Sequence, residues 1–127
     1  MLEEVIADLD NLMGRTFEDC CRHWVGHYAD EGLSGRPEQI GSWWSRDGSV
    51  EIDIVGVRRH RFELLGSCTW QRTVDEDALD ELYEQRAALG GKAARARLAL
   101  FARDGFTDRV RRRAANEDIM LVTATDL

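Results

Sequence analysis

Residues 50–70 contain two apolar, β-branched runs that are separated by a short basic segment. The first run covers residues 50–57, the second covers residues 62–70, and the basic segment is 58–61. Two such runs joined by a few polar residues are typical of a β-hairpin. We therefore expect a hairpin at the centre of the chain, with the other elements packed around it.

Asp53 lies inside the first apolar run, between Ile52 and Ile54. A carboxylate is costly to bury unless it is paired or binds a metal, so Asp53 is a candidate functional residue. Side chains alternate between the two faces of a strand. This alternation predicts that one face of the second run carries Leu65, Ser67 and Thr69, and that the other carries Leu64, Gly66, Cys68 and Trp70.

The length of 127 residues predicts a single domain, 1–127, that is large enough to bury a core. No apolar run approaches the roughly 18 residues of a membrane span, and no signal peptide opens the chain, so we expect no membrane partner. Three cysteines, two of them adjacent, make a poor disulfide framework. Their number and placement favour a reducing cytoplasm.

The net charge of −7 is unevenly distributed along the chain. Residues 1–57 carry 12 acidic and 4 basic side chains, whereas residues 91–115 carry 8 basic and 2 acidic ones. An acidic protein is a weak candidate for non-specific nucleic-acid binding, but a local basic surface can still contact phosphates. Solvated surface is the alternative interpretation. The candidate phosphate contacts are Arg58, Arg59 and Arg61 in the hairpin, and Arg109, Arg111, Arg112 and Arg113 near the C-terminus.

The remaining patterns predict an α/β fold. The order α-β-β-β-α-β-α-β implies a mixed sheet with helices on both faces. Outside the hairpin, the expected helices cover residues 2–29, 74–89 and 107–115, and the expected strands cover residues 40–44, 97–102 and 119–123.

Four segments resemble an uncharacterised domain at the C-terminus of certain archaeal and bacterial DEXX-box-type ATPases. They are MGRTFEDCCRHWV (13–25), IGSWWSRDGSVEIDIVGV (40–57), LLGSCTW (64–70) and LFARDGFTDRV (100–110), in the family's order. The hairpin is also similar to the PD-(D/E)XK nuclease core, in which an Asp on one strand precedes Glu-x-Lys on the next. The resemblance implies a restriction-endonuclease-like fold and an ATPase module as partner, in cis or in trans.

The nuclease resemblance also implies site residues. In such enzymes carboxylates hold Mg²⁺, which activates a water, and the lysine assists that water. Asp53 matches the motif's Asp, and Glu18 matches the acidic residue of the first helix. Ser67 stands at the Glu position and Thr69 at the Lys position. A hydroxyl is a weak Mg²⁺ ligand and threonine carries no positive charge, so the resemblance implies a vestigial site that binds Mg²⁺ weakly through Glu18 and Asp53.

The missing groups could be replaced from nearby. Glu51 shares a strand face with Asp53 by alternation, and Arg72 could partly replace the lysine, although arginine does not give up its proton. The alternative is that Glu18 and Asp53 persist as hydrogen-bonding partners in a degenerate pocket.

Cys20, His23 and His27 form a Cys-x-x-His-x-x-x-His pattern on one helical face. This spacing can bring three transition-metal ligands together. Buried thiols and a surface histidine are the plainer interpretation.

Trp43 and Trp44 are adjacent on a predicted strand, so they should face opposite ways, one in the core and one partly exposed. An exposed tryptophan could stack on nucleic-acid bases.

Three functional hypotheses follow from the sequence. The first is a degenerate nuclease-like domain that contacts DNA or regulates an ATPase. The second is an active Mg²⁺-dependent DNA endonuclease with a site remodelled at Glu18, Glu51 and Asp53. The third is a protein-interaction or dimerisation module that docks through the first helix and Trp43 or Trp44.

Overall fold

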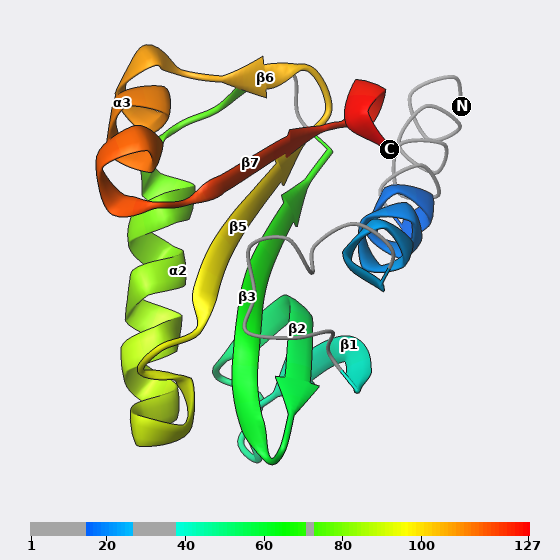
Figure 1. Cartoon of the computed structure of the whole chain (residues 1–127), viewed down its shortest axis with the longest axis vertical. Coiled ribbons are helices and arrows are strands. Elements are labelled where there is room, and N and C mark those ends of the chain that lie inside the picture. The colour runs from blue at the N-terminus through cyan, green and yellow to red at the C-terminus, as the bar shows by residue number, and fades with distance from the viewer. Residues whose placement is uncertain (1–14, 27–37, 71–72) are drawn as a thin grey trace, which may run out of the picture.

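The computed structural model describes residues 15–26, 38–70 and 73–127, and their elements follow the predicted order α-β-β-β-α-β-α-β (Figure 1). The parts of the first predicted helix at 2–14 and 27–29 lie outside the described residues. A two-residue parallel pair, β4 (Thr73–Val74) and β6 (Gly105–Phe106), was not predicted. The main elements are a helix at 15–26, β1 (Gln39–Trp44), β2 (Glu51–Arg58), β3 (Arg61–Thr69), α2 (Glu76–Leu89), β5 (Arg97–Ala102), α3 (Asp108–Glu117) and β7 (Met120–Thr123), with 3₁₀ turns at Gly90–Ala93 and Ala124–Asp126.

A five-stranded mixed sheet forms the middle layer, in the order β1-β2-β3-β5-β7. The first three strands are antiparallel neighbours, and β5 and β7 add in parallel beside β3. Each parallel step requires a crossover, and α2 and α3 provide the two crossovers. Both strands of the predicted hairpin, β2 and β3, are thus interior strands with a neighbour on each side.

Helices cover both faces of this sheet, as predicted. On one face, α2 and α3 bury apolar side chains against β3 and β5, and on the other face the helix at 15–26 does so. The first core includes Leu65, Leu79, Leu82, Leu98, Leu100, Val110 and Ala114, and the second includes Phe17, Cys21, Val25, Ile54, Leu64 and Phe101.

Side-chain caps fix the starts of α2 and α3. Asp75 accepts a hydrogen bond from the Asp77 N–H at the start of α2, and Gly90, at φ 75°, ends this helix. The prediction that α2 begins at Val74 was wrong by two residues, because Val74 belongs to β4. Thr107 caps α3 in the same way through the Val110 N–H.

Gly66 allows the centre of the sheet to pack closely. A Cβ atom at this position would lie 3.1 Å from the Phe101 ring and 3.2 Å from Ile54 Cβ, closer than ordinary packing permits. The alternation predicted for β3 is confirmed around Gly66. Leu65 packs in the core that α2 and α3 cover, whereas Leu64 and Cys68 pack in the core on the opposite face.

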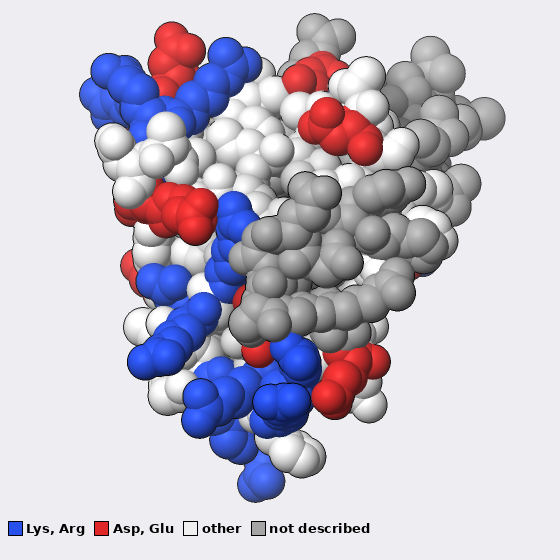
Figure 2. All heavy atoms as spheres, in the orientation of Figure 1, with Lys and Arg blue, Asp and Glu red and all other residues white. Residues whose placement is uncertain are grey.

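Charged side chains are unevenly distributed over the surface (Figure 2). Lysine and arginine side chains gather at the end of the molecule that carries the β2–β3 turn, toward the bottom of the view, and again around α3. These two regions contain the basic segments that the sequence predicted as phosphate contacts.

Candidate functional site

A β-bulge in β2 sets the position of Asp53. Gly41 of β1 pairs with Val55, but Trp43 pairs with Ile52, so Asp53 and Ile54 together lie opposite one residue of β1. A bulge of this kind interrupts the regular alternation of side chains between the two faces of the sheet. Consequently Ile52 packs in the α2 core and Ile54 in the opposite core, with Asp53 between them.

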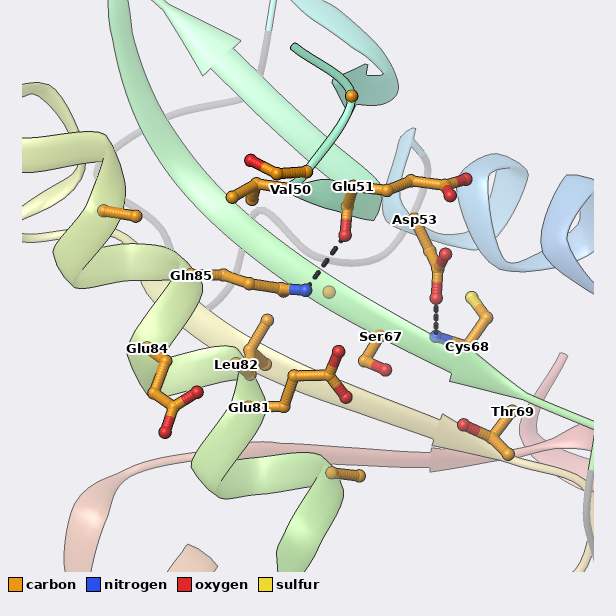
Figure 3. A pocket seen from close by; sticks show the side chains of 15 residues that line it. Val50, Glu51, Asp53, Ser67, Cys68, Thr69, Glu81, Leu82, Glu84 and Gln85 are labelled. Carbon is orange, nitrogen blue, oxygen red and sulfur yellow. Dashed lines mark hydrogen bonds between the residues drawn. The ribbon is translucent and has the colours of Figure 1, made fainter. Parts of the chain in front are cut away.

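The Asp53 carboxylate completes the hydrogen bonding of β3. The ladder between β2 and β3 reaches Ile54 and Gly66, and one step further Asp53 Oδ2 accepts a hydrogen bond from the Cys68 N–H at 2.9 Å (Figure 3). Burial raises the pKa of Asp53, the bond from Cys68 lowers it, and the negative charges of Glu51 and Glu81 raise it further. The net effect is a pKa above the ordinary value of 3.8.

Glu18 approaches the same place from the helix at 15–26. Burial and the charge of Asp53 raise the pKa of Glu18, and the nearby Arg22 guanidinium opposes them. Arg22 Nη1 donates to the Asp53 carbonyl oxygen at 3.2 Å, and its Nη2 forms an ion pair with Asp19 at 2.6 Å. These residues line a cavity of about 270 Å³ together with Glu51 and Trp44.

A larger cavity, about 680 Å³ in volume, lies on the other side of Asp53, between the hairpin and α2. Glu51, Asp53, Ser67 and Thr69 line it from the strands, and Glu81 reaches from α2 toward Ser67 (Figure 3). Gln85 Nε2 donates to the Glu51 carbonyl oxygen at 2.9 Å, which ties α2 to the start of β2. We call this space the α2 cavity.

The predicted carboxylates Glu18, Glu51 and Asp53 therefore lie close together, because the charges of Asp53 and Glu51 raise the pKa of Glu18 and the charge of Glu51 raises the pKa of Asp53. Sequence reasoning missed Glu81 and Arg22. Arg22 follows Glu18 by four residues, a spacing that places both on one side of a helix and could have indicated it. The predicted substitute cation, Arg72, lies outside the described residues.

The site is rich in carboxylates and poor in positive charge. Within residues 15–26, 38–70 and 73–127, no group of three or more His, Cys, Asp and Glu side chains is arranged to hold a metal ion. Carboxylate oxygens are the donor type that Mg²⁺ prefers, so Glu18 and Asp53 provide two suitable donors without a third arranged beside them.

The predicted cysteine–histidine motif is only partly described, because His27 lies outside the described residues. Cys20 and His23 are exposed and line a hollow of about 400 Å³ with Trp24 and Leu127. Cys21 is fully buried, and a hydrogen bond to Cys21, together with burial, raises the pKa of the Cys68 thiol.

The two tryptophans divide as predicted. Trp43 packs edge-on against Phe62, with ring centroids 6.4 Å apart. Trp44 is 58% exposed and lines the smaller cavity beside Glu18 and Asp53. An exposed aromatic side chain thus lies next to the carboxylates.

The predicted basic residues fall into two structural groups. In the β2–β3 turn, Arg59 and His60 both have left-handed backbone conformations, at φ 53° and 63°. Such a conformation costs a residue with a side chain about 1 kcal/mol. In α3, Arg109 forms an ion pair with Glu76, and Arg113 forms ion pairs with Asp80 and Glu117.

Fold and site together define a mixed α/β domain that gathers carboxylates at a bulge in a central strand. Residues 1–81 match the model of DUF234, a family of archaeal and bacterial proteins of unknown function, and the chain belongs to this family. No curated protein and no solved structure matches the chain. None of the helices in the described ranges is long and apolar enough to cross a membrane.

Proposed function

We propose that this chain is a degenerate PD-(D/E)XK nuclease-like domain, impaired in catalysis, that contacts DNA or regulates an ATPase module in the cytoplasm. The fold order and the Asp53 and Glu18 matches support the nuclease ancestry. The family resemblance supports the ATPase partner, in cis or in trans. The resemblance to nucleases and the basic surfaces support DNA as the ligand.

The observation that carries this proposal is the pair of hydroxyls opposite Asp53. Ser67 and Thr69 line the α2 cavity with Asp53, where a nuclease of this class would have a carboxylate and an ammonium group. A neutral hydroxyl provides neither a strong ligand nor a positive charge. Catalysis of phosphodiester cleavage depends on stabilising charge that develops in the transition state, and these substitutions remove the groups that would do so.

Mg²⁺ belongs to this proposal as a weakly bound ion. Glu18 and Asp53 would hold it through carboxylate oxygens, and a bound Mg²⁺ would stabilise charge on a phosphate. The chain's own contribution is to keep both carboxylates beside each other despite their raised pKa values. Arg22, which belongs to the helix at 15–26, offsets part of the repulsion between the two carboxylates.

Restoring the motif tests the proposal. The double variant Ser67→Glu/Thr69→Lys reintroduces both groups into a cavity that has space for them. We expect Mg²⁺-dependent conversion of supercoiled plasmid to open circles, on the order of 100-fold faster than by the wild type. Ser67→Gln/Thr69→Met, which has similar side-chain sizes without the charges, should remain as slow as the wild type.

Two outcomes would contradict the proposal. One is a wild-type chain that nicks plasmid rapidly and loses this activity in Asp53→Asn, which would establish the active endonuclease with a remodelled site. The other is a folded Ser67→Glu/Thr69→Lys variant that does not cleave, which would remove the support for a nuclease-type site.

A protein-interaction module remains the second candidate function, and the exposure of Trp44 favours it. An exposed tryptophan beside a cavity is typical of a binding surface. If this function is correct, the wild type should dimerise or bind an ATPase partner, and Trp44→Ala should weaken that binding at least tenfold. A monomer at high concentration with no affinity for the partner would exclude it.

A further inference from the structure

The two basic regions differ in how far the fold itself uses their charges. In α3, Arg109 and Arg113 are held by acidic side chains of α2 at 3.0 and 2.7 Å, whereas Arg111 and Arg112 are exposed and form no ion pair with the described residues. In the β2–β3 turn, Arg59 and Arg61 are exposed, and among the described residues neither forms an ion pair. Arg59 and Arg61 thus offer positive charge that no ion pair among the described residues uses.

The backbone conformation of this turn also indicates a functional role. A two-residue hairpin turn with positive φ at both central positions is normally occupied by Asn-Gly or a similar pair. Here Arg59 and His60 hold those positions at φ 53° and 63°. The chain therefore tolerates backbone strain while placing two large side chains, one of them the cationic Arg59, at the end of the hairpin, and strain of this kind is typical of functional segments.

We propose that the β2–β3 turn, residues 58–61, is a phosphate-contacting surface for duplex DNA. This inference rests on the proposed DNA contact and identifies the part of the molecule that makes it. Arginine presents a fork of N–H donors that suits phosphate oxygens. Arg59 and Arg61 flank His60 in the chain, and both are exposed. Lysine and arginine side chains gather at the end of the molecule that carries this turn (Figure 2).

The turn acts separately from the carboxylate site. Arg58 follows Asp53 by five residues in β2, which corresponds to roughly 17 Å along a strand. The basic surface and the carboxylates therefore occupy different ends of the same strand. Phosphate contact at the turn should position DNA without altering the groups around Asp53.

Binding of a fluorescein-labelled DNA duplex, followed by anisotropy between about 50 and 200 mM salt, tests the inference. Arg59→Gln/Arg61→Gln removes two charges and leaves side chains at the strained positions. We expect affinity to fall roughly tenfold per charge and the salt slope to decrease by about two. Arg111→Gln/Arg112→Gln removes equal charge from exposed positions of α3, and a larger loss of affinity in this variant than in the turn variant would overturn the assignment to the turn.

A second variant relieves the backbone strain and removes the charge of Arg59 at the same time. Arg59→Asn/His60→Gly fits the turn geometry, so its melting temperature should rise while duplex binding weakens. A higher melting temperature with unchanged binding would overturn the inference, because the turn would then be strained without a role in DNA contact.

The remaining outcomes distinguish the inference from the proposed function. A wild-type chain that binds no duplex overturns the DNA contact itself. A wild-type chain that binds duplex as tightly as Arg59→Gln/Arg61→Gln overturns only the assignment to the turn. Binding to phosphatidylserine vesicles, lost in the turn variant and without any binding to duplex, overturns nucleic acid as the partner.

Discussion

The site around Asp53 and the contact between α2 and α3 are both rich in charge, but the charges are arranged in opposite ways. Between the helices, Arg113 lies 2.7 Å from Asp80 and 3.0 Å from Glu117, and Tyr83 donates to Glu117 at 2.8 Å. Each charge there faces an opposite one. Such pairs contribute modestly to stability and fix how the two helices meet.

Around Asp53, like charges gather instead. The carboxylates of Glu18, Glu51 and Glu81 all approach Asp53, and the nearby Arg22 offsets only part of their repulsion. Raised carboxyl pKa values mean that ionisation of this site weakens the fold. Negative charges that weaken the fold are better explained by binding than by folding, which is why the carboxylate site and not the helix contact is the functional candidate.

The largest effect on stability should be found at Asp53, where one substitution removes both the hydrogen bond and the charge and another removes only the charge. Asp53→Ala leaves the Cys68 N–H without its acceptor, and we expect the free energy of unfolding to fall by about 1–3 kcal/mol. Asp53→Asn keeps an oxygen acceptor and removes the negative charge, so at neutral pH it should be more stable than the wild type. Urea denaturation of the three proteins measures both effects. Equal destabilisation by both substitutions would mean that the charge itself holds the site together, and the contrast with the helix contact would disappear.

The sequence was sufficient for the elements with a regular pattern. The β2–β3 hairpin, α2 and β5 follow from alternation, spacing and caps. The bulge at Asp53 could not be predicted, because it depends on the register between β1 and β2, which are joined by the turn at residues 45–50. The pairing of β4 with β6 could not be predicted either, since two residues are too short for a period to appear.

The candidate site shows the same limit. Asp53 was predicted from its place inside an apolar run, Glu51 from strand alternation and Glu18 from the family resemblance, whereas their surroundings arise only in three dimensions. Glu81 belongs to α2, and its approach to the strands depends on how that helix crosses the sheet. Arg22 contacts the backbone of Asp53, 31 residues further along the chain. Local sequence periodicity carries no information about contacts of this range.

A smaller effect is expected at the helix contact. Arg113→Met removes both ion pairs of this side chain while keeping its length, and we expect a loss of about 0.5–1 kcal/mol at low salt. The difference should shrink as salt screens the charges. Arg111→Met, on the exposed part of the same helix, is the matched control and should change stability by less. Equal effects of the two substitutions would show that Arg113 contributes through α3 propensity and not through its partners.

The smallest effects concern the pH dependence of stability. This dependence should have opposite signs at the site around Asp53 and at the contact between α2 and α3. The folded-state pKa of Glu18 is raised above its ordinary value of 4.5, chiefly by burial. Its contribution to stability is therefore complete below pH 4.5 and is lost as the pH rises through the higher folded-state pKa. Glu117 has a lowered pKa, chiefly because of its hydrogen bond from Arg113, so its contribution is present above pH 4.5 and is lost as the pH falls.

Melting temperatures between pH 3 and 8 should separate the two carboxyl groups. Relative to the wild type, Glu18→Gln should gain stability at neutral pH and lose that gain in acid. Glu117→Gln should lose stability at neutral pH and approach the wild type in acid. Two profiles with the same sign would show that the carboxylates near Asp53 are as well balanced by positive charge as those between the helices. The case for a binding site at the bulge would then rest on the cavities and the family resemblance alone.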